Sequence, residues 1–119
     1  MNPYEALANA IIEQAATDHK NAVKFLKKHP RTEELEADVA AQRLEKKKRR
    51  EERKKLNLPK EREKYSKEER LLENITSNER MVSETEKFFL SDWYSNLTSV
   101  DGAWLLDRIK KMEDDEYEG

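Results

Sequence analysis

The chain has no cysteine, two glycines and three prolines among its 119 residues. Without cysteine there is neither a disulfide framework nor thiolate chemistry. Glycine occurs only at Gly102 and Gly119, so no glycine-rich phosphate-binding loop exists. No apolar run approaches the ~18 residues that a membrane span needs, and no apolar segment near the N-terminus marks a signal peptide. We therefore expect a protein of the cytoplasm, without a membrane partner.

Charge is abundant instead. Charged residues make up 42% of the chain, against about 25% in typical soluble domains, yet the net charge is only -2. Residues 31–65 carry thirteen basic and nine acidic side chains, whereas residues 66–119 carry seven basic and fourteen acidic ones. A basic middle and an acidic C-terminal part indicate contact with charged partners.

Apolar residues at spacings of three and four predict a first helix over residues 3–28. Asn2 is a good N-cap and Pro3 suits the first helical position. Pro30 disfavours continuation, and His29 is placed to cap the C-terminal end.

A second helix is predicted over residues 32–56, with Thr32 as its cap. After Leu44 its side chains are all charged until Leu56. A helix that is polar all round is solvent-exposed or marginal, so we expect this one to project from the rest of the domain.

Residues 57–59 (Asn-Leu-Pro) break this helix, and Ser66 with Glu69 forms a capping box for a returning helix over 66–90. The two segments would form an antiparallel helical hairpin, partly of coiled-coil character. Residues 74–78 are weakly helical, which leaves open whether 66–90 is one helix or two.

Aromatic residues are concentrated in the C-terminal segment 91–112. Ser91 or Asp92 can start a short helix there, and Ser99 or Asp101 can start the last one. The acidic tail over 113–119 is expected to fray.

These elements predict an all-α protein with a single domain over residues 1–119. The N-terminal helix and the C-terminal aromatic helices would form a small base. The charged hairpin of 32–56 and 66–90 would project from this base.

Catalysis finds little support in the sequence. A nucleophile needs an adjacent base and an orienting group, and the only imidazoles are His19 and His29. We expect His19 to have a packing or surface role and His29 to cap its helix. The acidic run 114–116 lies in the tail, which offers no defined turn geometry for a hard cation. We expect no enzyme, no cofactor and no metal site.

Basic residues crowd one stretch of the second helix, and we take them as candidate partner-binding residues: Lys46, Lys47, Lys48, Arg49, Arg50, Arg53, Lys54 and Lys55. Two interpretations stay open. The stretch is either a solvated helix or a contact for an anionic partner, which would be nucleic acid or an acidic protein surface. Glu51 and Glu52 interrupt the run, and no aromatic residue lies within it for stacking on bases.

Five aromatic residues lie within seventeen residues of the C-terminal part: Phe88, Phe89, Trp93, Tyr94 and Trp104. Most of them must form the core, because few other large side chains exist to build one. Surplus aromatic surface is typical of interface hot spots, so Trp93, Tyr94 and Trp104 are further candidate partner-binding residues. A homodimer is one way to cover this surface.

Residues 86–106 resemble a family of small phage and prophage proteins from low-GC Gram-positive bacteria. The shared motif is Phe-Phe-x-Ser-x-Trp-(Phe/Tyr)-x-x-Leu-Thr-x-x-Asp-Gly, and residues 10–20 fit the first helix of that family. The charged stretch over about 33–80 looks like an insertion relative to shorter relatives. The resemblance implies no catalytic residue.

The resemblance and the charge asymmetry together lead to a functional expectation. The protein would be a non-catalytic phage accessory protein that binds another protein and inhibits a host defence nuclease, as anti-CRISPR proteins do. Its partner would then be a CRISPR effector nuclease or its complex, in the cytoplasm of the bacterial host. The alternative is a phage replication or regulatory protein that binds nucleic acid through residues 46–55.

Overall fold

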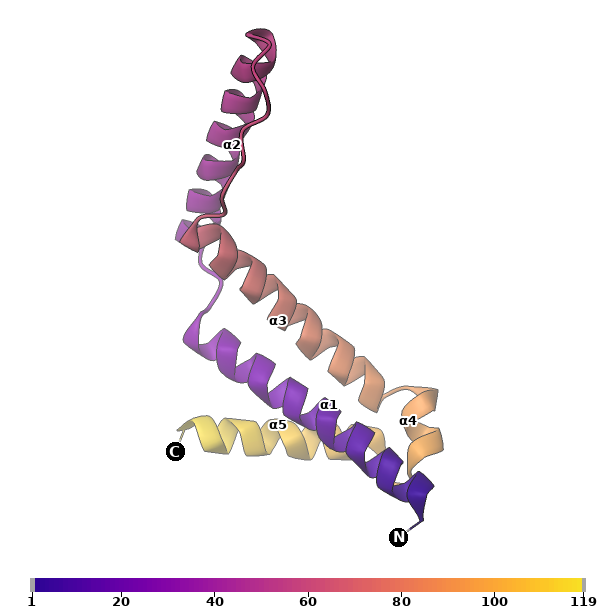
Figure 1. Ribbon diagram of the computed structural model, residues 1–119. Helices are drawn as coiled ribbons and strands as arrows, with labels where there is room; N and C mark the ends of the chain where they lie inside the picture. Colours follow the sequence, from indigo (N-terminus) through magenta and orange to yellow (C-terminus); the bar gives the residue numbers. More distant parts are fainter. Residues whose placement is uncertain (1, 119) are drawn as a thin grey trace. The chain divides into compact units, whose positions relative to one another are not determined.

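The computed structural model describes residues 2–118, with side chains described up to residue 115. Within this range the chain forms helices and no strand, which confirms the all-α prediction (Figure 1). The helices are α1 (Pro3–Lys28), α2 (Glu33–Lys55), α3 (Lys67–Phe89), α4 (Asp92–Leu97) and α5 (Gly102–Glu118). None of the helices in the described part is long and apolar enough to cross a lipid bilayer.

The chain divides into two compact units. Unit 1 comprises Met1–His29 and Ser77–Gly119, and unit 2 comprises Pro30–Thr76. Helix α3 contributes residues 67–76 to unit 2 and residues 77–89 to unit 1.

Helices α1 and α2 begin where their caps predict. The side-chain oxygen of Asn2 accepts a hydrogen bond of 2.8 Å from the backbone N–H of Glu5. The hydroxyl of Thr32 accepts one of 3.1 Å from the N–H of Leu35. Each bond satisfies a backbone donor that has no partner within the helix. His29 is the C-cap of α1, as expected.

Helices α4 and α5 settle two alternatives. Ser91 caps α4, because its hydroxyl accepts a hydrogen bond of 3.2 Å from the N–H of Tyr94. Asp101 starts α5, because its carboxylate accepts one of 2.9 Å from the N–H of Trp104. In both helices, the side-chain oxygen of the residue before the helix therefore accepts a hydrogen bond from the backbone N–H three residues later.

A capping box starts α3. The hydroxyl of Ser66 accepts a hydrogen bond from the N–H of Glu69 (3.1 Å), and the carboxylate of Glu69 accepts one from the N–H of Ser66 (3.3 Å). The helix then continues to Phe89 without a break at residues 74–78. The segment 66–90 is thus one helix.

The hairpin differs in one respect from the expected pair of antiparallel helices. Residues 58–66 are not helical, and Figure 1 shows them running back along α2 without regular secondary structure. We call residues 58–66 the return segment. Asn57 adopts a left-handed φ of 54°, and the N–H of Leu58 donates to the carbonyl of Arg53 (2.9 Å), which ends α2 as a C-terminal cap. Pro59 then keeps Leu58 out of the helical region.

The core of unit 1 is aromatic. Phe89, Tyr94 and Leu106 are buried together, and six partly buried residues pack around them: Ile12, Ala15, Ala16, Phe88, Leu105 and Ile109. Figure 1 shows α5 passing along α1, with α4 near the N-terminal end of α1. The core thus joins the first helix to the last two, as the expected base requires.

The expectation that residues 113–119 fray is wrong for the described part of that segment. Helix α5 continues to Glu118, and Glu113 is buried. The carboxylate of Asp114 lies 3.3 Å from the ammonium of Lys27 on α1. Glu113 and Asp114 thus both contact basic side chains of α1.

Candidate functional site

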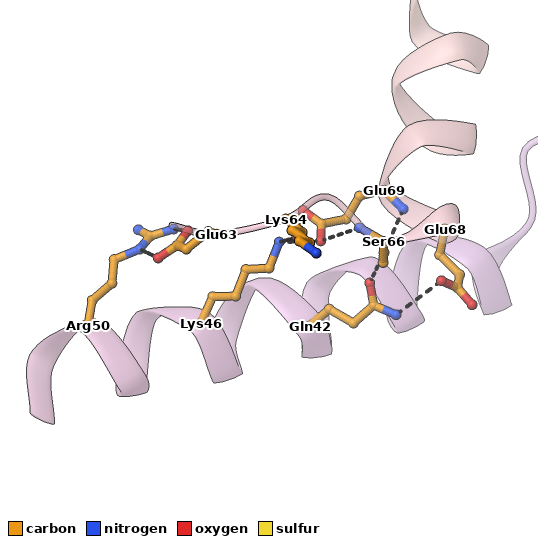
Figure 2. A network of polar contacts seen from close by, with 8 residues as sticks. All are labelled: Gln42, Lys46, Arg50, Glu63, Lys64, Ser66, Glu68 and Glu69. Atoms are coloured by element: carbon orange, nitrogen blue, oxygen red, sulfur yellow. Dashed lines mark hydrogen bonds and ion pairs between the residues drawn. The ribbon is translucent and has the colours of Figure 1, made fainter. Parts of the chain in front are cut away.

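A row of polar side chains on α2 faces the return segment and the start of α3 in unit 2 (Figure 2). Gln42, Lys46, Arg50 and Arg53 are spaced by four, four and three residues, which places them on one face of the helix. We call these four residues the paired stripe. Each of them donates to an acceptor between residues 59 and 69.

Lys46 is a half-buried cation of the paired stripe. Its ammonium donates to the carboxylate of Glu69 (2.6 Å) and to the carbonyl of Lys64 (2.9 Å). Glu69 is only 3% exposed, so this charge requires a partner. The hydrogen bond from Lys46 holds the pKa of Glu69 below its usual value, against the opposing effect of burial.

Arg50 and Arg53 continue the row toward the end of α2. The guanidinium of Arg50 donates from two nitrogens to the two carboxylate oxygens of Glu63, the fork geometry that arginine forms with carboxylates. This hydrogen bond lowers the pKa of Glu63. Arg53 instead donates twice to the carbonyl of Pro59, at 3.0 and 2.8 Å. Its positive charge therefore meets no carboxylate in this contact.

Gln42 closes the other end of the row. Its side-chain oxygen accepts a hydrogen bond from the hydroxyl of Ser66, and its amide nitrogen donates to Glu68 at 3.4 Å. The backbone N–H of Glu68 and the Gln42 amide lower the pKa of the Glu68 carboxyl. Gln42 thus holds the capping residue of α3 against α2.

The structure divides the predicted basic run into two sets. Lys46, Arg50 and Arg53 are bonded to acceptors of the chain itself, as described above. Four of the others are exposed and form no ion pair with any residue that the structure describes: Lys47, Lys48, Lys54 and Lys55. Arg49 is exposed as well, with its nearest carboxylate, that of Glu45, at 3.8 Å. Some residues of the basic run therefore hold unit 2 together, and the others present positive charge to the solvent.

A groove of about 800 Å³ lies between the C-terminal half of α2 and the return segment. Its lining consists of Lys46, Arg49, Arg50, Arg53, Lys54, Asn57, Leu58, Lys60, Glu61 and Glu63. Six of these side chains are cationic and two are anionic, so we call it the basic groove. Sequence reasoning singled out its α2 side but missed Lys60, because only the fold brings the return segment alongside α2.

Unit 1 contains a buried histidine between two carboxylates. His19 on α1 is 1% exposed, and its Nδ1 lies 2.7 Å from the Oε1 of Glu113 on α5. Its Nε2 lies 3.6 Å from the Oε2 of Glu86 on α3. Burial is the largest influence on Glu86 and favours a raised pKa, but the 2.6 Å contact with Lys110 and the nearby His19 together lower the pKa.

One ring nitrogen of His19, Nδ1, is hydrogen-bonded to Glu113, whereas the buried Nε2 has no hydrogen-bond partner among the described residues and lies within ion-pair distance of Glu86. Among the described residues, no hydroxyl or thiol side chain is hydrogen-bonded to this imidazole. His19 lies near the apolar stripe of α1, which left a packing or a surface role open, and the structure places it in the packed interior of unit 1. Its partners could not be read from the sequence, because they lie far along the chain on separate helices. Among the described residues, no group of histidine and acidic side chains could hold a metal ion.

The aromatic candidates separate into buried and exposed members. Trp93 and Trp104 are each 57% exposed, whereas Tyr94 is 1% exposed. Tyr94 therefore belongs to the core and cannot contact a partner, which corrects its place among the candidate partner-binding residues. Trp93 packs edge-on against Phe88 at 5.3 Å, and the guanidinium of Arg108 lies over the Trp104 ring at 5.9 Å.

No known protein family, curated protein or solved structure matches the chain.

Proposed function

We propose that the protein is non-catalytic and acts by binding another protein through Trp93 and Trp104. The supporting observation is that both tryptophans are 57% exposed although the core of their unit is aromatic. Tryptophan is among the residues that contribute most to binding at protein interfaces. The core centred on Phe89, Tyr94 and Leu106 does not include either tryptophan, so both side chains are available without unfolding the unit.

The specific form of the proposal follows from the resemblance to phage proteins. We take the partner to be a protein of the bacterial host, and in particular a defence nuclease such as a CRISPR effector, which the protein would inhibit. Inhibition needs no catalytic group, since occupying a functional surface is sufficient.

The test is capture of the partner by the full chain and by single variants, Trp93→Ala and Trp104→Ala. Truncating a hot-spot residue costs ~2 kcal/mol or more, so capture of a purified CRISPR effector should weaken by at least about tenfold. Leu56→Ala is the matched control, because Leu56 is a large apolar residue of unit 2 that is also well exposed. Circular dichroism verifies that each variant remains helical. Unchanged capture by both folded tryptophan variants would refute the aromatic contact.

A nuclease assay addresses the inhibitor proposal separately. The chain should slow target cleavage by the captured effector, and the tryptophan variants should restore cleavage. An effector that binds the chain and cleaves at its normal rate would contradict inhibition and leave binding intact.

A further inference from the structure

We propose that the basic groove of unit 2 binds a single strand of nucleic acid through its phosphate groups. This inference concerns a different unit from the protein-binding proposal and does not depend on it. A volume of about 800 Å³ is in the range of sites for small ligands, which suits a short stretch of one strand rather than a duplex.

The inference is based on cationic side chains of the groove that have no close carboxylate partner among the described residues. Lys46 and Arg50 are neutralised by Glu69 and Glu63, and their contribution is mainly structural. Arg53 keeps its full charge, because it donates to the carbonyl of Pro59 rather than to a carboxylate.

Three further cations of the lining are available to a ligand. Lys54 and Lys60 form no ion pair with the described residues, and Arg49 reaches Glu45 only at 3.8 Å on an exposed surface, where such a contact is weak. Apart from Glu63, which pairs with Arg50, the anionic side chain of the lining is Glu61. The cationic side chains outnumber it, so the groove has a net positive charge.

The lining favours phosphate over an acidic protein segment. Leu58 is the one large apolar side chain that lines the groove, and no aromatic ring does. Protein partners are held mainly by apolar and aromatic anchors in pockets, which this groove lacks. Non-specific binding of a phosphodiester strand rests essentially on charge, which lysine and arginine supply, and it does not require contacts to the bases.

The ion pair between Arg50 and Glu63 leads to a further prediction about the affinity of the groove for its ligand. The guanidinium fork that holds the Glu63 carboxylate has the geometry that also fits a phosphate. Glu63 therefore competes with the ligand for Arg50 and adds a like charge that repels the strand. Removing this carboxylate should strengthen binding.

The experiment measures binding of a fluorescent oligothymidylate of about 12 nucleotides to the full chain by anisotropy, from ~20 to ~200 mM salt. The groove variant combines Arg49→Gln, Lys54→Gln and Lys60→Gln. The slope of log affinity against log salt is negative, and each lost phosphate contact reduces its magnitude by about 0.7 for a single strand, so this variant should make the slope less negative by about 2. Its affinity at the lowest salt should fall by at least about tenfold.

The matched control combines Lys47→Gln, Lys48→Gln and Lys55→Gln. It removes the same charge from exposed positions of α2 that do not line the groove. The proposal expects this control to lose much less affinity than the groove variant, and it expects Glu63→Gln to gain affinity. Circular dichroism confirms that the variants keep their helices.

Three outcomes would overturn the proposal. The first is no binding by the unmodified chain at the lowest salt. The second is an equal loss for the groove variant and the control, which would mean diffuse attraction to the whole helix. The third is tighter binding of a poly-glutamate peptide of equal charge, which would assign the groove to an acidic protein segment.

Discussion

Unit 1 and unit 2 are stabilised by different interactions, although both are helical. Unit 1 buries aromatic rings of α3 and α4 against α1 and α5, with Phe89 and Tyr94 at the centre. Unit 2 buries Val39, Leu72 and Ile75, but along the second half of α2 its contacts are hydrogen bonds and ion pairs of the paired stripe. Burial of apolar area involves no titrating group and is not weakened by charge screening, whereas exposed ion pairs are sensitive to both pH and salt.

The comparison shows why so hydrophilic a chain can still fold. The apolar residues are few, and the aromatic ones are concentrated where unit 1 needs a core. The charged residues of unit 2 are arranged by helical spacing so that many of them pair within the chain. Trp93 and Trp104 are the two tryptophans of the chain and both belong to unit 1, so tryptophan fluorescence reports on unit 1 alone.

The largest expected effect is loss of the aromatic core. Phe89→Ala removes a ring that is 1% exposed, and such truncations cost about 3–5 kcal/mol. Chemical denaturation followed by tryptophan fluorescence should show this loss in unit 1. Hydrogen exchange of the amides over residues 45–55 of α2 should change much less. A similar rise in exchange there would mean that the two units unfold together, which would contradict their separate stabilisation.

The next effect concerns the polar contact inside unit 1. His19→Leu leaves the buried carboxylate of Glu113 without its 2.7 Å partner, and an unsatisfied buried group costs about 1–3 kcal/mol. The same denaturation measurement should detect it. The double variant His19→Leu with Glu113→Leu removes both polar groups and should recover much of the loss. No recovery would mean that His19 acts through its shape rather than through this contact.

Unit 2 should be the more acid-sensitive unit. The pKa values of Glu63, Glu68 and Glu69 lie below their usual value of 4.5 in the folded chain, whereas unit 1 has one such carboxyl, that of Glu86, among its described residues. A lowered folded-state pKa adds stability above the unfolded value, and this stability is lost as the pH falls through the folded value. The protection of the α2 amides, corrected for the pH dependence of intrinsic hydrogen exchange, should therefore fall below about pH 4.5, before tryptophan fluorescence changes.

Lys46→Gln tests whether the contact between Lys46 and Glu69 causes the acid sensitivity of α2. It removes the cation that lowers the pKa of Glu69, so exchange of α2 should be faster at neutral pH and less dependent on acid. Lys47→Gln is the control, because Lys47 is an exposed lysine of the same helix without an ion pair in the described part of the chain. Equal effects of both substitutions would show that the paired stripe adds no local stability.

Much of the fold follows from local sequence signals. Asn2, Thr32, Ser66 and Ser91 each predict a helix start because a cap acts over three residues. The interactions that the sequence hides are those between distant residues. The pairing of His19 with Glu113, and the approach of Lys60 to α2, depend on how the helices pack. In a chain with 26 acidic residues, spacing alone cannot identify the acidic partner of a particular cation.

The exposed tryptophans and buried Tyr94 make the same point for the candidate site. Trp93 and Tyr94 are neighbours in the sequence and have similar hydrophobic character, so composition cannot separate them. In helix α4 they point about 100° apart, and only Tyr94 faces the core. The orientation of a six-residue helix thus decides which ring is available to a partner.

The smallest expected effect tests how well the aromatic core is packed. The hydroxyl of Tyr94 is buried and has no hydrogen-bond partner among the described residues, and burial together with nearby Asp101 raises its pKa. Burying a hydroxyl without a partner costs free energy, so Tyr94→Phe should leave unit 1 equally stable or stabilise it by up to about 1 kcal/mol. Thermal unfolding followed by tryptophan fluorescence measures this change. A clear loss of stability would mean that the hydroxyl is hydrogen-bonded in solution, in which case the core of unit 1 is partly polar and closer in character to unit 2.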